Sequence, residues 1–163
     1  MWTARRILKE LADTDRRRAI LTTFWKQADA HHRTIVQMQL AKSLHFREET
    51  IRKMPVEKKA DLLASRIGVP EFDQYLEMAL MQYHTSQQKE MMGAFLDRWN
   101  VPHENGSIES DDYKVPSADD VRAAVKELSS FDPADVKIYL ATAGLLMAGE
   151  WRDAAWPVVD EMT

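Results

Sequence analysis

Cysteine is absent from this chain of 163 residues. The absence excludes disulfides, a thiolate nucleophile, a CxxC redox pair and any zinc or iron–sulfur site held by cysteine. Long apolar runs are also missing, because the longest nearly uncharged apolar stretch, residues 139–149, is far shorter than the roughly 20 residues of a membrane-spanning helix. Charges at Arg5 and Arg6 come too early for a secretory leader. We therefore expect a cytoplasmic protein with no membrane partner.

Glycine is scarce, with five residues, and none of them belongs to a phosphate-binding loop or to a GxSxG nucleophile motif. No nucleophilic side chain has a base partner at a motif spacing. The HExxH and Glu-x-x-His metal motifs are missing as well. An enzyme is therefore not the first expectation, and we expect no resident metal ion and no cofactor.

Helical periodicity runs through nearly the whole chain, and no stretch alternates apolar and polar residues as a strand does. A hydrophobic content of 45% and a charged content of 29% are typical of a globular protein. We predict a single all-α domain over residues 1–163, folded as an irregular bundle of about nine or ten short helices. The alternative is a short helical-repeat solenoid, because Arg66–Pro70 recurs loosely as Arg98–Pro102.

Residues with capping side chains mark several predicted helix starts. Each lies just before an apolar stripe, and the four positions are Asp13 or Thr14, Asp29, Ser117 and Asp132. Pro70 is expected to open a helix as a first-turn residue. Gly68 is expected to close the preceding helix, residues 56–67, in the left-handed conformation.

A polar insert interrupts the apolar stripe between residues 71 and 99. Thr85 and Gln88 have capping-box spacing, which predicts two helices divided near residue 86, with one continuous helix as the alternative. Methionines surround this insert, and flexible thioethers serve both as core filler and as adaptable binding surface. We predict that the insert lines a small pocket, with four candidate residues: Tyr83, His84, Gln87 and Gln88.

The only long loop is predicted at about residues 100–116, where Asn, Gly, Ser, Pro and acidic residues are concentrated. Loops of this length are often functional. The acids do not keep the register of an EF-hand, so a calcium site is not expected. We predict a contact surface here, with six candidate residues: Trp99, His103, Glu104, Asp111, Asp112 and Tyr113.

Charge divides the chain into two halves. Up to Pro70 there are fifteen basic and eight acidic residues, and from Glu71 onward there are seven and eighteen, giving net charges of +7 and −11 and a total of −4. The densest basic cluster consists of Arg16, Arg17 and Arg18, at the start of a predicted helix, where the helix dipole disfavours positive charge. We expect acidic neighbours for this cluster, from the acidic half or from a partner subunit.

The leading functional hypothesis is a protein–protein interaction module, or a self-associating one, that uses the two halves as complementary surfaces. One alternative is nucleic-acid binding by the basic half, since Leu63–Pro70 resembles the turn of a helix-turn-helix unit. The helix that follows begins with Glu71 and Asp73, which argues against contact with phosphates. Another alternative is a metal-dependent or small-molecule enzyme with a site near His84 or the 103–112 loop.

Overall fold

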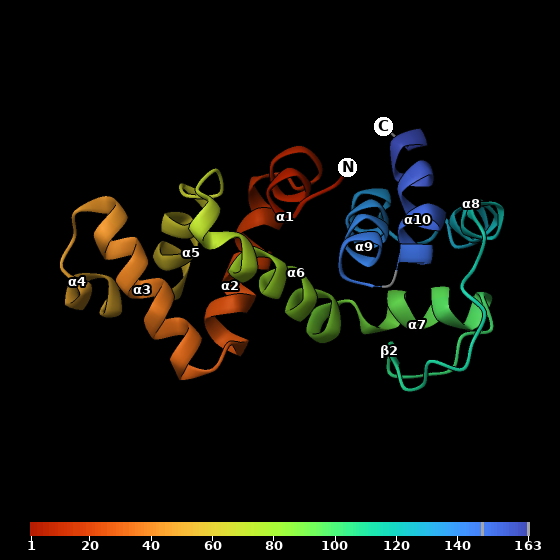
Figure 1. Cartoon of the computed structure of the whole chain (residues 1–163), viewed down its shortest axis with the longest axis horizontal. Helices are drawn as coiled ribbons and strands as arrows, with labels where there is room; N and C mark the ends of the chain where they lie inside the picture. Colours follow the sequence, from red (N-terminus) through yellow and green to blue (C-terminus); the bar gives the residue numbers. More distant parts are fainter. Residues whose placement is uncertain (148, 163) are drawn as a thin grey trace.

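The computed structural model describes residues 1–147 and 149–162, and it is built almost entirely of helices (Figure 1). The described chain contains ten α-helices, which confirms the predicted all-α fold of about nine or ten short helices. In chain order they are α1 (Ala4–Arg6), α2 (Thr14–Gln27), α3 (Ala30–Leu44), α4 (Glu48–Arg52), α5 (Val56–Ala64), α6 (Asp73–Gln87), α7 (Lys89–Arg98), α8 (Ala118–Glu127), α9 (Pro133–Leu146) and α10 (Gly149–Glu161).

Four other short elements are present in the described chain: a π-helical turn η1 (Ile7–Leu11), a 3-10 turn η2 (Pro70–Phe72), and the strands β1 (His103–Glu104) and β2 (Ser107–Ile108). The strands pair antiparallel inside the predicted long loop, where no strand was expected. No helix in the described ranges has both the length and the apolar character needed to cross a membrane.

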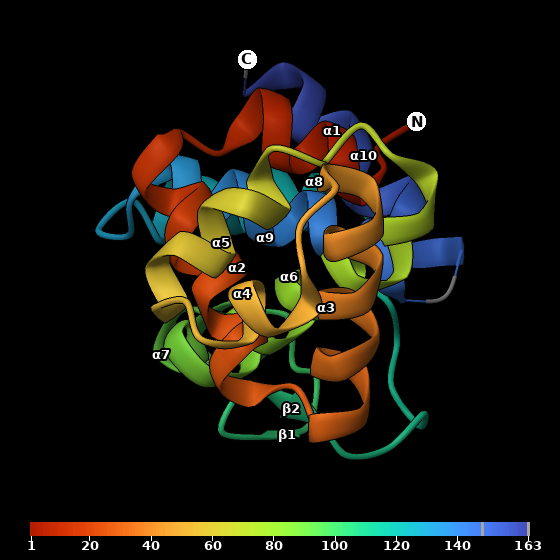
Figure 2. The same ribbon diagram turned by 90° about the vertical axis from the view of Figure 1, so that its left-hand side faces the viewer.

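The helices form an elongated irregular bundle, in which α3, α4 and α5 lie at one end and α8, α9 and α10 at the other (Figure 1). Helix α6 runs between the two ends and is followed by α7. Helix α2 packs against α5 and α6, as the view from the α3–α5 end also shows (Figure 2), and α10 packs against α9 and α8. Buried apolar side chains from Trp2 to Val159 form one continuous cluster through both ends.

Four helices begin where the capping residues predicted them. The side chains of Asp13, Asp29 and Asp132 each accept a hydrogen bond from a backbone N–H in the first turn of α2, α3 and α9. Ser117 and Asp120 form a reciprocal capping box at the start of α8. These caps satisfy N–H groups that have no partner within the helix, so the predicted starts are confirmed.

Gly68 does not close a helix, so that prediction is wrong. Helix α5 ends at Ala64, and Gly68 is not among the described residues with positive φ. The helix instead tightens at its end, because the N–H of Arg66 donates to the carbonyl of Leu63, three residues earlier, at 3.0 Å. A glycine in the left-handed conformation is therefore not needed to end it.

Thr85 does not cap a new helix either. Its hydroxyl donates to the carbonyl of Met81 at 2.9 Å, as a threonine inside a helix commonly does, and α6 continues to Gln87. The chain nevertheless divides at Gln88, where α6 ends and α7 follows. Two helices in this region are therefore confirmed, with the boundary two residues later than predicted.

Helix α9 is enclosed by other elements and requires a glycine at one contact. Residues 138–144 are all buried, and the helix packs against α10, α6 and η1. A Cβ atom added at Gly144 would lie 2.4 Å from Nε1 of Trp156 on α10. That indole also donates to the carbonyl of Ala141 at 3.1 Å, which holds the ring in place. Only glycine therefore allows α9 and α10 to approach this closely.

We expect Gly144→Ala to lower the free energy of unfolding by about 1–3 kcal/mol, because the added methyl group forces the Trp156 ring away from α9. Urea denaturation followed by circular dichroism measures the change. Gly149→Ala is the matched control, since a Cβ there meets no atom within 4 Å. Equal stabilities of the two variants would show that the close contact is not required.

Candidate functional site

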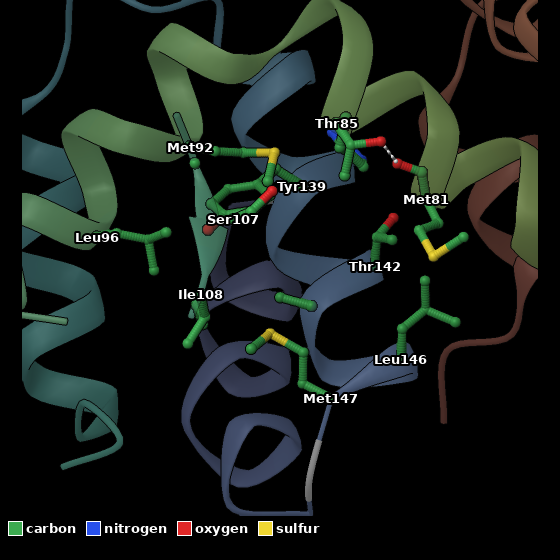
Figure 3. Close-up of a pocket in the computed structure, with 13 residues that line it drawn as sticks. Met81, Thr85, Met92, Leu96, Ser107, Ile108, Tyr139, Thr142, Leu146 and Met147 are labelled. Atoms are coloured by element: carbon green, nitrogen blue, oxygen red, sulfur yellow. Dashed lines mark hydrogen bonds between the residues drawn. The ribbon is translucent and has the colours of Figure 1, made fainter. Parts of the chain in front are cut away.

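A cavity of about 320 Å³ lies where α6, α7, the β1–β2 hairpin and α9 meet (Figure 3). Met81, Thr142 and Leu146 lie along one side of it, and Met92, Ser107 and Ile108 lie along the other. Apolar side chains form most of the lining, and none of the described lining residues is acidic, lysine or arginine. The lining is completed by His84, Thr85, Leu96, Gly106, Tyr139, Ala143 and Met147.

The hairpin closes one side of this cavity, and its turn depends on two residues with positive φ. Asn105 has φ 50° and Gly106 has φ 85°, the geometry of a two-residue hairpin turn. A Cβ atom at Gly106 would lie 3.0 Å from Cβ of Met92, so the glycine also lets the hairpin approach α7. The Asn-Gly pair is the signal in the sequence from which this hairpin could have been predicted.

His84 lies inside the core beside the cavity and is only 3% exposed. Neither ring nitrogen hydrogen-bonds with any described residue. Its ring makes edge contacts with the rings of Tyr83 and Tyr139, at centroid distances of 5.5 and 5.6 Å. Burial lowers the pKa of His84 to about 3, so the imidazole is neutral at physiological pH, with one nitrogen a donor and the other an acceptor.

Two hydroxyl groups on α9 accompany His84. Thr142 and Tyr139 are three residues apart on one face of the helix and both line the cavity. The Thr142 hydroxyl is buried and has no hydrogen-bond partner among the described residues. Burial raises the pKa of Tyr139, so its hydroxyl stays protonated. Each buried polar group without a hydrogen-bond partner lowers the free energy of unfolding by about 1–3 kcal/mol. Two side chains with such groups, His84 and Thr142, border this one cavity.

The cavity opens to the surface between apolar side chains. Met81 and Leu146 are lining residues, yet they are 48% and 39% exposed. They are two of the few large apolar side chains that are exposed on the described chain. An apolar molecule would therefore meet apolar surface at the entrance as well as inside.

Only one of the four predicted pocket residues lines this cavity. His84 lines the cavity, whereas Tyr83, Gln87 and Gln88 are not among the lining residues. The Gln87 amide donates to the hydroxyl of Thr23 on α2 at 2.8 Å, and the Gln88 amide donates to the Tyr83 hydroxyl at 3.0 Å. Around the end of α6, Tyr83 and Gln88 thus bond to each other, and Gln87 bonds to α2.

The aromatic residues predicted as a contact surface hold the long loop to the body. The Trp99 indole is buried and donates to the carbonyl of Asp120 at 3.3 Å, and the Tyr113 hydroxyl accepts from the indole of Trp151 at 3.0 Å. His103 accepts from the N–H of Gly106 at 3.1 Å through Nδ1. Its Nε2 lies 2.8 Å from a carboxylate oxygen in α7.

The predicted acids of the same loop, Glu104, Asp111 and Asp112, are exposed. Among the residues that the structure describes, no three histidine or carboxylate side chains are grouped as metal ligands. Use of the three acids in contacts with a partner stays a prediction.

The basic cluster at the start of α2 is engaged within the chain. Arg16 forms ion pairs with Asp132 at 2.7 Å and with Asp135 at 2.9 Å, so the acidic half supplies two of its partners. Arg17 donates to two backbone carbonyls just before α2, and Arg18 pairs with a carboxylate of α5 at 2.9 Å. A role of this cluster in binding another molecule stays a prediction.

Nothing among protein-family models, curated proteins or solved structures matches this chain. Its function therefore has to be inferred from the chemistry of the cavity.

We expect His84→Leu to flatten the acid dependence of stability. An unfolded histidine gains its proton near pH 6.5, whereas folded His84 gains it only near its pKa of about 3. The unfolded state therefore binds more protons between these values, and the free energy of unfolding falls by up to about 1.4 kcal/mol per pH unit as the pH drops from 6.5. Urea denaturation from pH 7.5 to 4.5 measures the slope.

The control for this prediction is His31→Gln, because His31 is exposed on α3. It should keep the slope of the natural protein. If His84→Leu retains the same slope as this control, the imidazole is not held neutral by burial.

A second prediction concerns Arg16, whose side chain is 25% exposed and joins α2 to the start of α9. We expect Arg16→Gln to lower the free energy of unfolding by about 1–2 kcal/mol, because it removes the ion pairs of the guanidinium with three carboxylates, those of Asp13, Asp132 and Asp135. The control Lys53→Gln should show no measurable change, since that lysine is 71% exposed. Chemical denaturation compares the two variants, and equal losses would contradict the structural role of Arg16.

Proposed function

We propose that this protein binds a small, uncharged and mainly apolar molecule in the cavity between α6, α7, the hairpin and α9. The volume of about 320 Å³ lies within the range of small-molecule sites, and the mostly apolar lining with a few polar groups is typical of them. The observation that carries the proposal is the pair of buried side chains, His84 and Thr142, whose polar atoms have no described partner. A ligand with a polar group supplies what they lack.

The charge state of the lining indicates the ligand's chemistry. A neutral imidazole and two hydroxyl groups can each donate and accept, so they favour a group that does both, such as an alcohol or an amide. A charged group would lose its hydration without gaining an opposite charge, because the described lining contains none. The thioethers of Met81, Met92 and Met147 can adapt to apolar bodies of different shape.

The proposal rests on the residues of this cavity and not on the charged surface. A cytoplasmic location and contacts with a protein partner or a second copy stay predictions from the sequence. These predictions are compatible with a ligand site, because none of the exposed acids of the long loop lines the cavity.

Hexan-1-ol is a suitable probe, and hexanoate is its charged counterpart of similar length. We expect calorimetry at pH 7.5 to detect binding of the alcohol and much weaker binding of the carboxylate, because the lining offers no positive charge. Methyl NMR signals of Met92 and Met147 should shift with the alcohol. Equal binding of both probes, or no binding of the alcohol at millimolar concentration, would contradict the proposal.

Thr142→Val separates a binding role from a structural role. The hydroxyl has no described partner in the protein, so its replacement should leave the free energy of unfolding unchanged or raise it. Binding of hexan-1-ol should weaken about fivefold, the effect of one lost hydrogen bond. Thr22→Val on α2, outside the cavity lining, is the control and should change neither quantity.

A further inference from the structure

A second recess lies at the opposite end of the molecule, among α2, α3, α4 and α5, the end that faces the viewer in Figure 2. Its volume is about 260 Å³. Three basic side chains reach it from three different helices: Arg33 from α3, Arg52 from α4 and Lys59 from α5. None of its described lining residues is acidic.

Two of these three cations are unpaired. The side chains of Arg33 and Lys59 form no ion pair or hydrogen bond with any described residue. Arg52 has only a long contact of 3.5 Å with Glu49, a carboxylate that also pairs with Lys53 at 3.1 Å. The positive charge in this recess is therefore not compensated by the protein.

The uncompensated charge affects the pKa of Lys59. Its burial, and then the charge of Arg33, lower the pKa of the ammonium group. The ammonium group lies over the ring of Trp25, whose centroid is 5.4 Å from Nζ, and this cation–π contact stabilises the charge. An anion between Arg33 and Lys59 would relieve their repulsion.

Trp25 adds an unused hydrogen-bond donor to the lining. Its side chain is 3% exposed, and its indole N–H is buried without a partner among the described residues. Buried indole groups usually find an acceptor. The recess thus combines unpaired cations with a buried donor, and both features point to a ligand rich in acceptor oxygens.

We propose that this recess binds the dianionic phosphate group of a small molecule. Two unpaired cations match two negative charges, and the planar guanidinium of Arg33 suits bidentate contact with phosphate oxygens. The recess is larger than a phosphate ion, which leaves room for an organic part beside Trp25 and Val56. This site is independent of the cavity at His84, because no lining residue is shared and the charges differ.

A small molecule is favoured over a nucleic-acid strand. Three exposed acids, Glu48, Glu49 and Glu57, lie on the same two short helices, α4 and α5, that supply Arg52 and Lys59. A continuous polyanion crossing this surface would pass close to them and be repelled. A single phosphate group can enter the recess without crossing the acids.

Inorganic phosphate is the probe, titrated into the full chain at pH 7.5 with chloride added to keep the ionic strength constant. We expect saturable binding by calorimetry and a shift of the Trp25 indole NMR signal, assigned with Trp25→Phe. Lys59→Gln and Arg33→Gln should each weaken binding by about tenfold. Lys58→Gln is the matched control, since Lys58 is the exposed neighbour of Lys59 and does not line the recess, and it should leave binding unchanged.

Three results would overturn the proposal. The first is the absence of saturable binding up to about 20 mM phosphate. The second is an equal effect of Lys59→Gln and Lys58→Gln, which would indicate diffuse surface charge. The third is tighter, Lys59-dependent binding of a single-stranded oligonucleotide without a terminal phosphate, which would indicate a nucleic-acid surface. If circular dichroism shows that Arg33→Gln does not fold, Lys59→Gln alone tests the proposal. Lys59→Gln is expected to fold, because it removes a positive charge that burial already disfavours in the folded protein.

Discussion

The enclosure of α9 is the constraint on which the rest of the structure depends. Seven consecutive residues, 138–144, are buried, so nearly two full turns of this helix have no side facing water. A helix buried all round needs neighbours on every side, and α10, α6 and η1 are among them. Gly144 makes room for the closest of these neighbours, and Arg16 holds the start of α9 from outside the core. The two ends of the chain thereby share one apolar cluster.

The same enclosure creates the cavity and determines its chemistry. Where α6 turns into α7 at Gln88, the helices no longer cover α9 fully, and the β1–β2 hairpin covers the remaining side only in part. Thr142 and Tyr139 face this space from α9, and His84 faces it from α6. Because both side chains are buried among apolar groups, the imidazole of His84 is neutral and the hydroxyl of Tyr139 stays protonated. These conditions are the basis for the proposal that the ligand is uncharged.

Charge is used differently at the two ends of the molecule. Around α9 the acidic half neutralises basic groups, as in the pairing of Arg16 with Asp132 and Asp135. At the α3–α5 end, Arg33 and Lys59 converge with no acid in the described lining. The division of net charge along the sequence is therefore only partly cancelled in the fold, and this recess is one place where positive charge remains.

Local sequence signals determined the helices of this protein, and tertiary packing determined its candidate sites. Capping side chains such as Asp13 and Ser117 act on N–H groups two or three residues away, so helix starts could be predicted. The failed prediction at Gly68 and the unexpected hairpin at Asn105 concern a helix end and a turn, where several local conformations compete. The surroundings of His84, and the meeting of Arg33 with Lys59, depend on helices far apart in sequence. The burial of a side chain and the compensation of its charge depend on the residues that pack beside it, and the tertiary structure determines which residues these are.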